Sequence, residues 1–111
     1  MKLNVSVEGK NEIERFILFL NLAMTIAIKE GVISINDAEN YIYNPYSLKK
    51  LNEMGINKKV SDLIHLGCEL EDIESLIPHK LSKSIEEINR QSIKLLQEIQ
   101  VESNHAKEWI D

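Results

Sequence analysis

The residue types that most often carry chemistry are few in this chain and poorly grouped. Its one cysteine, Cys68, lies three residues after His65, and His79 follows. Zinc needs four ligands, or three and a water in a catalytic site, and a nucleophilic thiolate needs an electropositive pocket. Acidic residues follow Cys68, so we expect the pKa of its thiol to be raised. The pattern indicates neither a metal site nor a catalytic pair.

Known catalytic and cofactor signatures are also missing from the sequence. It contains no glycine-rich phosphate loop, no nucleophile elbow and no His-Glu-x-x-His pattern. General acid–base catalysis would require a carboxyl group in an apolar pocket, which a sequence cannot show. We therefore predict a protein that is not an enzyme and that binds no cofactor or metal.

Two clusters are better candidates for binding. The first is acidic and falls within six residues: Glu69, Glu71, Asp72 and Glu74. Carboxylates at the start of a helix are stabilised by the helix dipole, so a solvated helix end is one interpretation. The other interpretation is a docking patch for a basic protein surface, because such charge speeds association and selects partners.

The second cluster contains all three tyrosines of the chain, Tyr41, Tyr43 and Tyr46, around Asn44-Pro45. Tyrosine is enriched in interface hot spots, but it also packs at helix junctions with its ring buried and its hydroxyl in water. Both interpretations stay open. The seven acidic and aromatic residues form the predicted partner-binding set, although the sequence does not show that they share a face.

Composition limits the classes of partner. The formal net charge is −5, which argues against nucleic acid, because nucleic-acid binding relies on a basic footprint. The apolar run from Phe16 to Ile28 is shorter than the roughly 20 residues of a membrane span, so we expect no membrane association. A single cysteine gives no sign of an oxidising compartment, and we expect a cytoplasmic protein.

The hydrophobic pattern predicts helices along most of the chain. Residues 2–7 alternate apolar and polar, which is typical of a strand or an extended arm that either rests on the helices or pairs with another chain. Residues 11–30 read as a helix that is apolar nearly all round, and such a helix is expected to be central and covered on several sides. Further helices are expected at about 35–43 and 45–54, from 57 or 61 to 66, at about 69–77, and from 82 or 84 onward.

Capping residues support these boundaries. Asn11 is the expected N-cap of the first helix, and Gly31 and Gly67 are expected helix stops. Ser34 with Asp37, and Ser84 with Glu87, have capping-box spacing. An apolar seam with heptad spacing follows in the last helix: Leu81, Ile85, Ile88, Ser92, Leu95 and Ile99.

Together these patterns predict an all-α fold, a compact bundle of about five to six helices around a central hydrophobic helix, with a short N-terminal extended strand or arm. We expect one helical domain over residues 1–111, divided into an arm at 1–10, a helical core at 11–102 and a tail at 103–111.

The stretches GVISINDAENYIYNPYSLKKL and LGCELEDIESLIPHKL, with the start of the last helix, resemble an uncharacterised family of small bacterial helical proteins. The resemblance covers most of residues 15–98 and rests on two short acidic helices, the Asn44-Pro45-Tyr46 junction and the Leu76-Ile77-Pro78 stop. None of these is a catalytic motif, so the resemblance implies a helical fold and little more. By analogy, small acidic proteins of this style serve as immunity proteins beside secreted toxins.

The leading functional hypothesis is a non-enzymatic protein-binding module. In its most concrete form it is an immunity protein that neutralises a bacterial toxin by occluding it, with a basic toxin domain as its partner. A structural or regulatory homo-oligomer, a homodimer for example, joined through the N-terminal strand or the last helix, is the alternative hypothesis. A small enzyme is a third.

Overall fold

The structure, a computed structural model, describes residues 1–99, 101 and 107–111. Four helices are longer than two turns: α1 (Lys10–Lys29), α3 (Pro45–Glu53), α4 (Lys58–Cys68) and α6 (Leu81–Glu98). Two others, α2 (Ile35–Tyr41) and α5 (Leu70–Leu76), have seven residues each, and a 3-10 helix at Pro78–Lys80 leads into α6. The mostly helical fold is as predicted.

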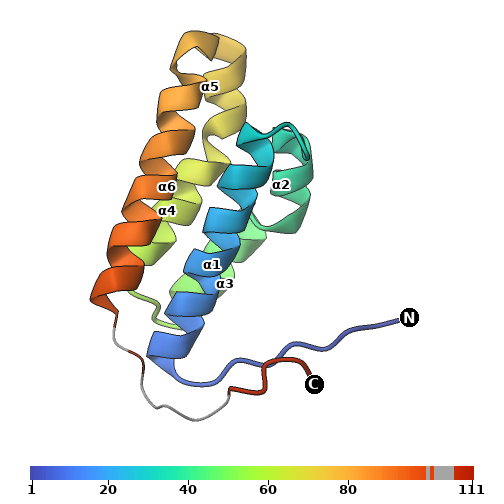
Figure 1. The fold of residues 1–111 in the computed structure, drawn as a ribbon, viewed down its shortest axis with the longest axis vertical. Coiled ribbons are helices and arrows are strands. Elements are labelled where there is room, and N and C mark those ends of the chain that lie inside the picture. The colour runs from blue at the N-terminus through green and yellow to red at the C-terminus, as the bar shows by residue number, and fades with distance from the viewer. Residues whose placement is uncertain (100, 102–106) are drawn as a thin grey trace.

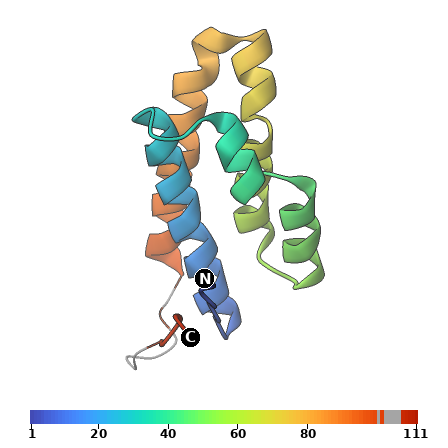
Figure 2. The same cartoon turned by 90° about the vertical axis from the view of Figure 1, so that its right-hand side faces the viewer.

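The arrangement is a compact bundle of the long helices with short helices at its edges. α1 packs mainly along α6, and α4 packs against both α6 and α1 (Figure 1). α5 and the 3-10 helix form one end of the molecule, and α2 and α3 lie beside α1 and α4 (Figure 2). The predicted count of five to six bundle helices is not matched, because α2 and α5 are too short to be more than connections between the longer helices.

Of the two predictions for the N-terminal segment, a strand or an extended arm, the strand is wrong. Within the described residues the segment forms only an isolated antiparallel bridge between Val5 and Ile110. The backbone N–H of Ser6 donates to the Trp109 carbonyl at 2.8 Å, and that of Asp111 donates to the Asn4 carbonyl at 2.9 Å. The alternation in the sequence reflects a real extended arm, but its partner is too short to form a ladder. The boundary between core and tail was predicted between residues 102 and 103, and both lie outside the described residues.

The first helix is not covered on all sides. Its most buried stripe is largely polar and consists of Glu14, Leu18, Asn21 and Thr25. Apolar side chains elsewhere on α1 keep much of their surface, with Phe19 41% and Ile26 52% exposed. The apolar run therefore produces a surface helix that turns a polar stripe inward, which hydropathy alone does not reveal.

The inward stripe is polar because it forms a buried hydrogen-bond network. The Asn21 side chain donates to the Ser92 hydroxyl on α6 at 2.8 Å and accepts a bond from the Tyr43 hydroxyl. Asn89 on α6 donates to the Thr25 hydroxyl at 3.2 Å. Because a buried polar group without a partner costs about 1–3 kcal/mol, these bonds fix how α1, α6 and the α2–α3 junction pack together.

A buried carboxylate makes the corresponding contact with α4. Glu14 is 3% exposed and accepts a hydrogen bond from the backbone N–H of Asn57 at 2.8 Å. Asn57 is the N-cap of α4, and its own side chain accepts from Lys59 N. The N-terminus of α4 thus receives a negative charge where the helix dipole favours one.

The predicted start and stop signals are only partly correct. Ser34 and Asp37 form a capping box, and Gly31 has the positive φ of 72° that a left-handed stop requires. α1 begins at Lys10 with Gly9 as its N-cap, so Asn11 is already helical. Ser84 lies inside α6 and does not cap it. The 3-10 helix at Pro78–Lys80 leads directly into α6, which therefore begins at Leu81.

Gly67 does not stop a helix but lies inside α4, two residues before Glu69, the C-cap of that helix. A Cβ atom built at this position would overlap the ring of Tyr43. The Tyr43 side chain is 1% exposed, and its ring lies against Gly67 while its hydroxyl donates to Asn21. Glycine is thus required for close approach of the ring, not for its conformational freedom.

We predict that Gly67→Ala lowers the free energy of unfolding by about 1–3 kcal/mol, the usual cost of overpacking a core. In an unobstructed helix the same change is stabilising by roughly 0.5–1 kcal/mol, so the sign is diagnostic. Urea denaturation measures it, and the Tyr43→Ala background provides the control. If the penalty of Gly67→Ala persists in that background, the Tyr43 ring is not its cause.

Candidate protein-interaction site

The α2–α3 junction positions the candidate site. The Asn44 side chain donates to the Glu39 carbonyl at 2.7 Å and accepts from the backbone N–H of Ser47 at 2.9 Å. It therefore closes α2 and caps α3, while Pro45 occupies the first helical position of α3. Both sides of this junction carry a tyrosine at the surface.

The structure separates the three predicted tyrosines. Tyr41 is 68% exposed and Tyr46 is 75% exposed, whereas Tyr43 is buried in the core. Burial raises the pKa of Tyr43 well above its ordinary value, with a smaller contribution from Cys68, so its hydroxyl stays a donor to Asn21. Tyr43 has no surface to offer a partner, and the aromatic part of the site reduces to Tyr41 and Tyr46.

The two exposed tyrosines border an apolar groove of about 530 Å³. The groove is lined by α1, α2 and α3, which Figure 2 shows together, and by Val5 and Val7 of the N-terminal arm. Its floor on α1 includes Ile17, Leu20 and Met24. The sequence did not predict this groove, because the apolar run of α1 was expected to be covered on several sides.

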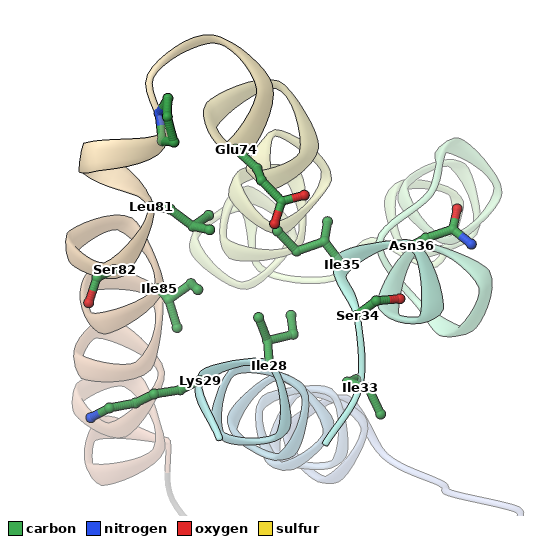
Figure 3. Close-up of a pocket in the computed structure, with 11 residues that line it drawn as sticks. Ile28, Lys29, Ile33, Ser34, Ile35, Asn36, Glu74, Leu81, Ser82 and Ile85 are labelled. Carbon is green, nitrogen blue, oxygen red and sulfur yellow. The ribbon is translucent and has the colours of Figure 1, made fainter. Parts of the chain in front are cut away.

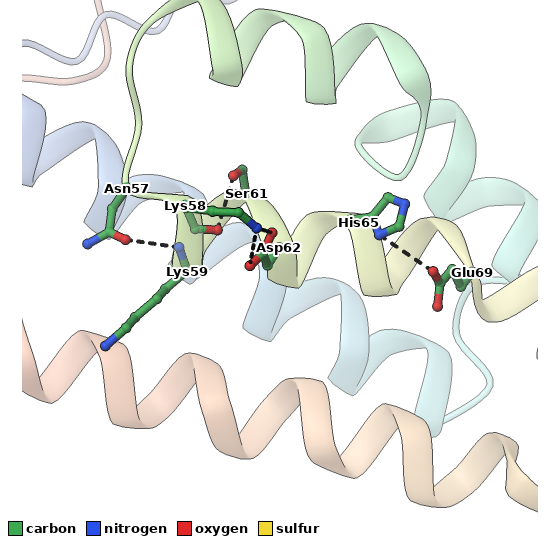
Figure 4. Close-up of polar contacts among 7 residues, drawn as sticks. All are labelled: Asn57, Lys58, Lys59, Ser61, Asp62, His65 and Glu69. Atoms are coloured by element: carbon green, nitrogen blue, oxygen red, sulfur yellow. Dashed lines mark hydrogen bonds and ion pairs between the residues drawn. The ribbon is translucent and has the colours of Figure 1, made fainter.

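The four predicted carboxylates are all exposed, but they do not form one patch. Glu69 lies 3.5 Å from Nδ1 of His65, one turn earlier on α4 (Figure 4). Glu74 lines a different pocket, of about 460 Å³, together with Ile28, Ile35 and Ile85 (Figure 3).

Glu71 and Asp72 instead group with Glu39 of α2, which the sequence analysis did not single out. The pKa of Glu39 is raised above its ordinary value of 4.5 by desolvation, then by the hydrogen bond with Glu71 and the negative charges of Glu71 and Asp72. The only signal in the sequence was that both short helices are acidic. We call Glu39, Glu71 and Asp72 the acidic triad.

The acidic triad and the tyrosines lie at the two sides of α2. Glu39 and Tyr41 both belong to this helix, and α2 packs against α5 on one side and leads into α3 on the other. Carboxylate repulsion and exposed aromatic surface thus flank the same short helix. A basic group bound there would relieve the repulsion, and the tyrosines would contribute apolar contact area.

The remaining candidates for chemistry are not assembled. Cys68 is half-buried, and its thiol pKa is raised by burial and then by Glu39 and Glu69. In the part of the chain that the structure describes, no three His, Cys, Asp or Glu residues are grouped to hold a metal ion. No helix among the described residues is long and apolar enough to span a bilayer.

The chain matches a family model described as a protein of unknown function, DUF3969, over residues 8–111. The chain belongs to the DUF3969 family. No curated protein and no solved structure matches it. Membership of DUF3969 agrees with the expectation of an uncharacterised family, and the functional argument rests on the site.

We predict that Glu39→Gln stabilises the fold by roughly 0.5 kcal/mol at pH 7, the scale of one surface charge contact. The folded state holds the Glu39 proton more tightly than the unfolded state, so this residue's contribution becomes unfavourable as the pH rises above 4.5. The difference between the variant and the parent should therefore vanish below about pH 4. Urea denaturation across this pH range tests the sign. An advantage that is constant with pH would contradict it.

We predict that Cys68→Ser keeps the fold, with a change of at most about 1 kcal/mol in the free energy of unfolding. The raised thiol pKa keeps the sulfur protonated and unreactive at neutral pH. Reaction of the parent with a thiol-specific reagent should therefore be slower than that of a free cysteine. Fast modification of the native protein would reopen a catalytic role.

Proposed function

We propose that this protein is a non-enzymatic binding module that docks a basic protein partner on α2 and its neighbours. The observation that carries the proposal is that α2 is flanked by the acidic triad, which α2 and α5 supply, and by exposed Tyr41 and Tyr46, which lie on α2 and α3 beside an apolar groove. Carboxylates attract a basic surface over a Debye length of about 8 Å. Tyrosines supply the apolar anchors that slow its release.

The most concrete form of this function is that of an immunity protein, which occludes a toxin domain. Such a role requires fast association with a basic partner and a rigid surface. The net charge of −5 and the hydrogen-bonded α2–α3 junction support both requirements. No catalytic chemistry by this chain is needed.

The direct experiment measures binding to the product of the adjacent gene by biolayer interferometry at several salt concentrations, and the proposal expects that product to be basic. Changing Glu39 and Glu71 to lysine should slow association by at least about tenfold at low salt and flatten its salt dependence. Tyr41→Ala and Tyr46→Ala should mainly speed dissociation.

A matched control is Glu86→Lys with Glu98→Lys, which makes the same charge change on the exposed surface of α6. The proposal expects this control to associate almost as fast as the parent. Equal slowing by both pairs would show that only net charge matters. If no variant changes the kinetics, the partner binds elsewhere. If the adjacent-gene product is a toxin, an equimolar amount of the parent protein should abolish its activity.

A further inference from the structure

An apolar pocket lies between α4, α5 and α6, which pack against one another at one end of the molecule (Figure 1). Its volume is about 540 Å³, within the roughly 300–1,000 Å³ of small-molecule sites. One apolar side chain from each helix lines it: Leu66, Ile73 and Ile88. Ile88 is 2% exposed, and the other two are partly buried against the core. The fold therefore holds this apolar lining in place.

The polar lining of the pocket is mainly basic, although the protein carries a net charge of −5. His79 and Lys80 belong to the 3-10 helix, and Lys83 belongs to the first turn of α6. All three are exposed, and none makes an ion pair or a side-chain hydrogen bond within the described part of the chain. Two ammonium groups and an imidazole thus border an apolar pocket without an anionic partner.

Glu87, the one carboxylate among the described residues that line the pocket, is already occupied. Arg90 donates to both of its oxygens, from Nη2 to Oε1 at 2.5 Å and from Nε to Oε2 at 3.2 Å. The Gln91 side chain donates to Oε1 at 2.7 Å. Lys83 acts on Glu87 only through its charge at longer range. Because Arg90 and Gln91 are not part of the lining, they neutralise Glu87 from outside and leave the lysines uncompensated.

Little apolar surface surrounds the pocket. A stable protein interface covers about 800 Å² on each partner around an apolar centre. No large apolar side chain of α4 is exposed, and Ile93, the exposed one in the described part of α6, does not line the pocket. Leu76 and Ile77 at the end of α5 are exposed but also lie outside the lining. Apolar area confined to the pocket favours a small molecule over a protein segment.

We propose that this pocket binds a medium-chain fatty-acid anion. The apolar tail contacts Leu66, Ile73 and Ile88, and the carboxylate accepts charge-assisted hydrogen bonds from Lys80 and Lys83. A ligand with both parts covers the apolar lining and neutralises the basic rim together. The proposal does not rest on the proposed function, because the acidic triad and the residues of the groove beside the tyrosines do not line this pocket.

Isothermal titration calorimetry of the whole chain with sodium decanoate, below the concentration at which it forms micelles, tests the ligand class. We expect saturable binding of one decanoate per chain. Acetate, which lacks the tail, and decyltrimethylammonium, which has the same chain with the opposite charge, should each bind at least about tenfold more weakly. Absence of decanoate binding, or equal binding of the two amphiphiles, would overturn the proposal.

A lysine pair tests the site. Lys80→Gln with Lys83→Gln should weaken decanoate binding by at least about tenfold, because the carboxylate loses both charged donors. The matched control is Lys59→Gln with Lys94→Gln, which makes the same charge change on α4 and α6 beside a different pocket. The control should bind decanoate as the parent does, and both pairs should keep the helical circular dichroism spectrum. Equal weakening by the two pairs would overturn the site.

Methyl NMR spectra locate the bound tail. The signals of Leu66, Ile73 and Ile88 should shift on titration with decanoate. Those of Met24 should not, because Met24 lines the groove beside the tyrosines. That groove is the natural competitor, since it is also apolar and carries one lysine, Lys50. Shifts confined to the groove would overturn the proposal, whereas shifts confined to the pocket between α4, α5 and α6 would support it.

Discussion

The side-chain amide of Asn21 is the interaction on which the rest of the structure depends. It is 0% exposed, and it joins the Tyr43 hydroxyl to the Ser92 hydroxyl across the bundle. A buried amide left without these partners would cost about 1–3 kcal/mol, a large share of the 5–15 kcal/mol that stabilises a domain. The contacts of Asn21 therefore specify one packing of α1 against α6 and the α2–α3 junction.

This constraint also shapes the surface. Because α1 turns its polar stripe inward, most of its apolar side chains are only partly buried, and several of those packed against the core also line the groove. Tyr43 is held against Gly67 and Asn21, whereas Tyr41, two residues earlier, and Tyr46, three residues later, are exposed. The candidate interaction surface is thus a consequence of how the core satisfies its hydrogen bonds.

Sequence reasoning predicted what local chemistry determines. The all-α class, the capping box at Ser34, the break at Asn44-Pro45 and the apolar seam of α6 follow from propensity, capping and periodicity, and the structure contains them. The seam residue Ser92 looked like a gap in an apolar stripe, but it is the position that binds Asn21.

Features that depend on long-range contacts were not predictable in this way. The proximity of Glu39 to Glu71 depends on how α2 packs against α5, and the burial of Tyr43 depends on a glycine far away in the chain. Gly67 was interpreted as a stop because glycine is common after helices, whereas here it makes room for a ring. The arm has strand-like alternation, but no sequence pattern revealed that its bridge partner would be only a few residues long.

The central role of Asn21 is tested most directly by a double-mutant cycle between Asn21→Ala and Tyr43→Phe, with the free energy of unfolding measured in urea. Each variant removes one side of the same buried hydrogen bond without removing the Tyr43 ring. The account predicts that the two losses are not additive and that the coupling energy is about 1–2 kcal/mol. A coupling energy within about 0.3 kcal/mol of zero would show that the bond does not hold the junction to α1, and would contradict the account.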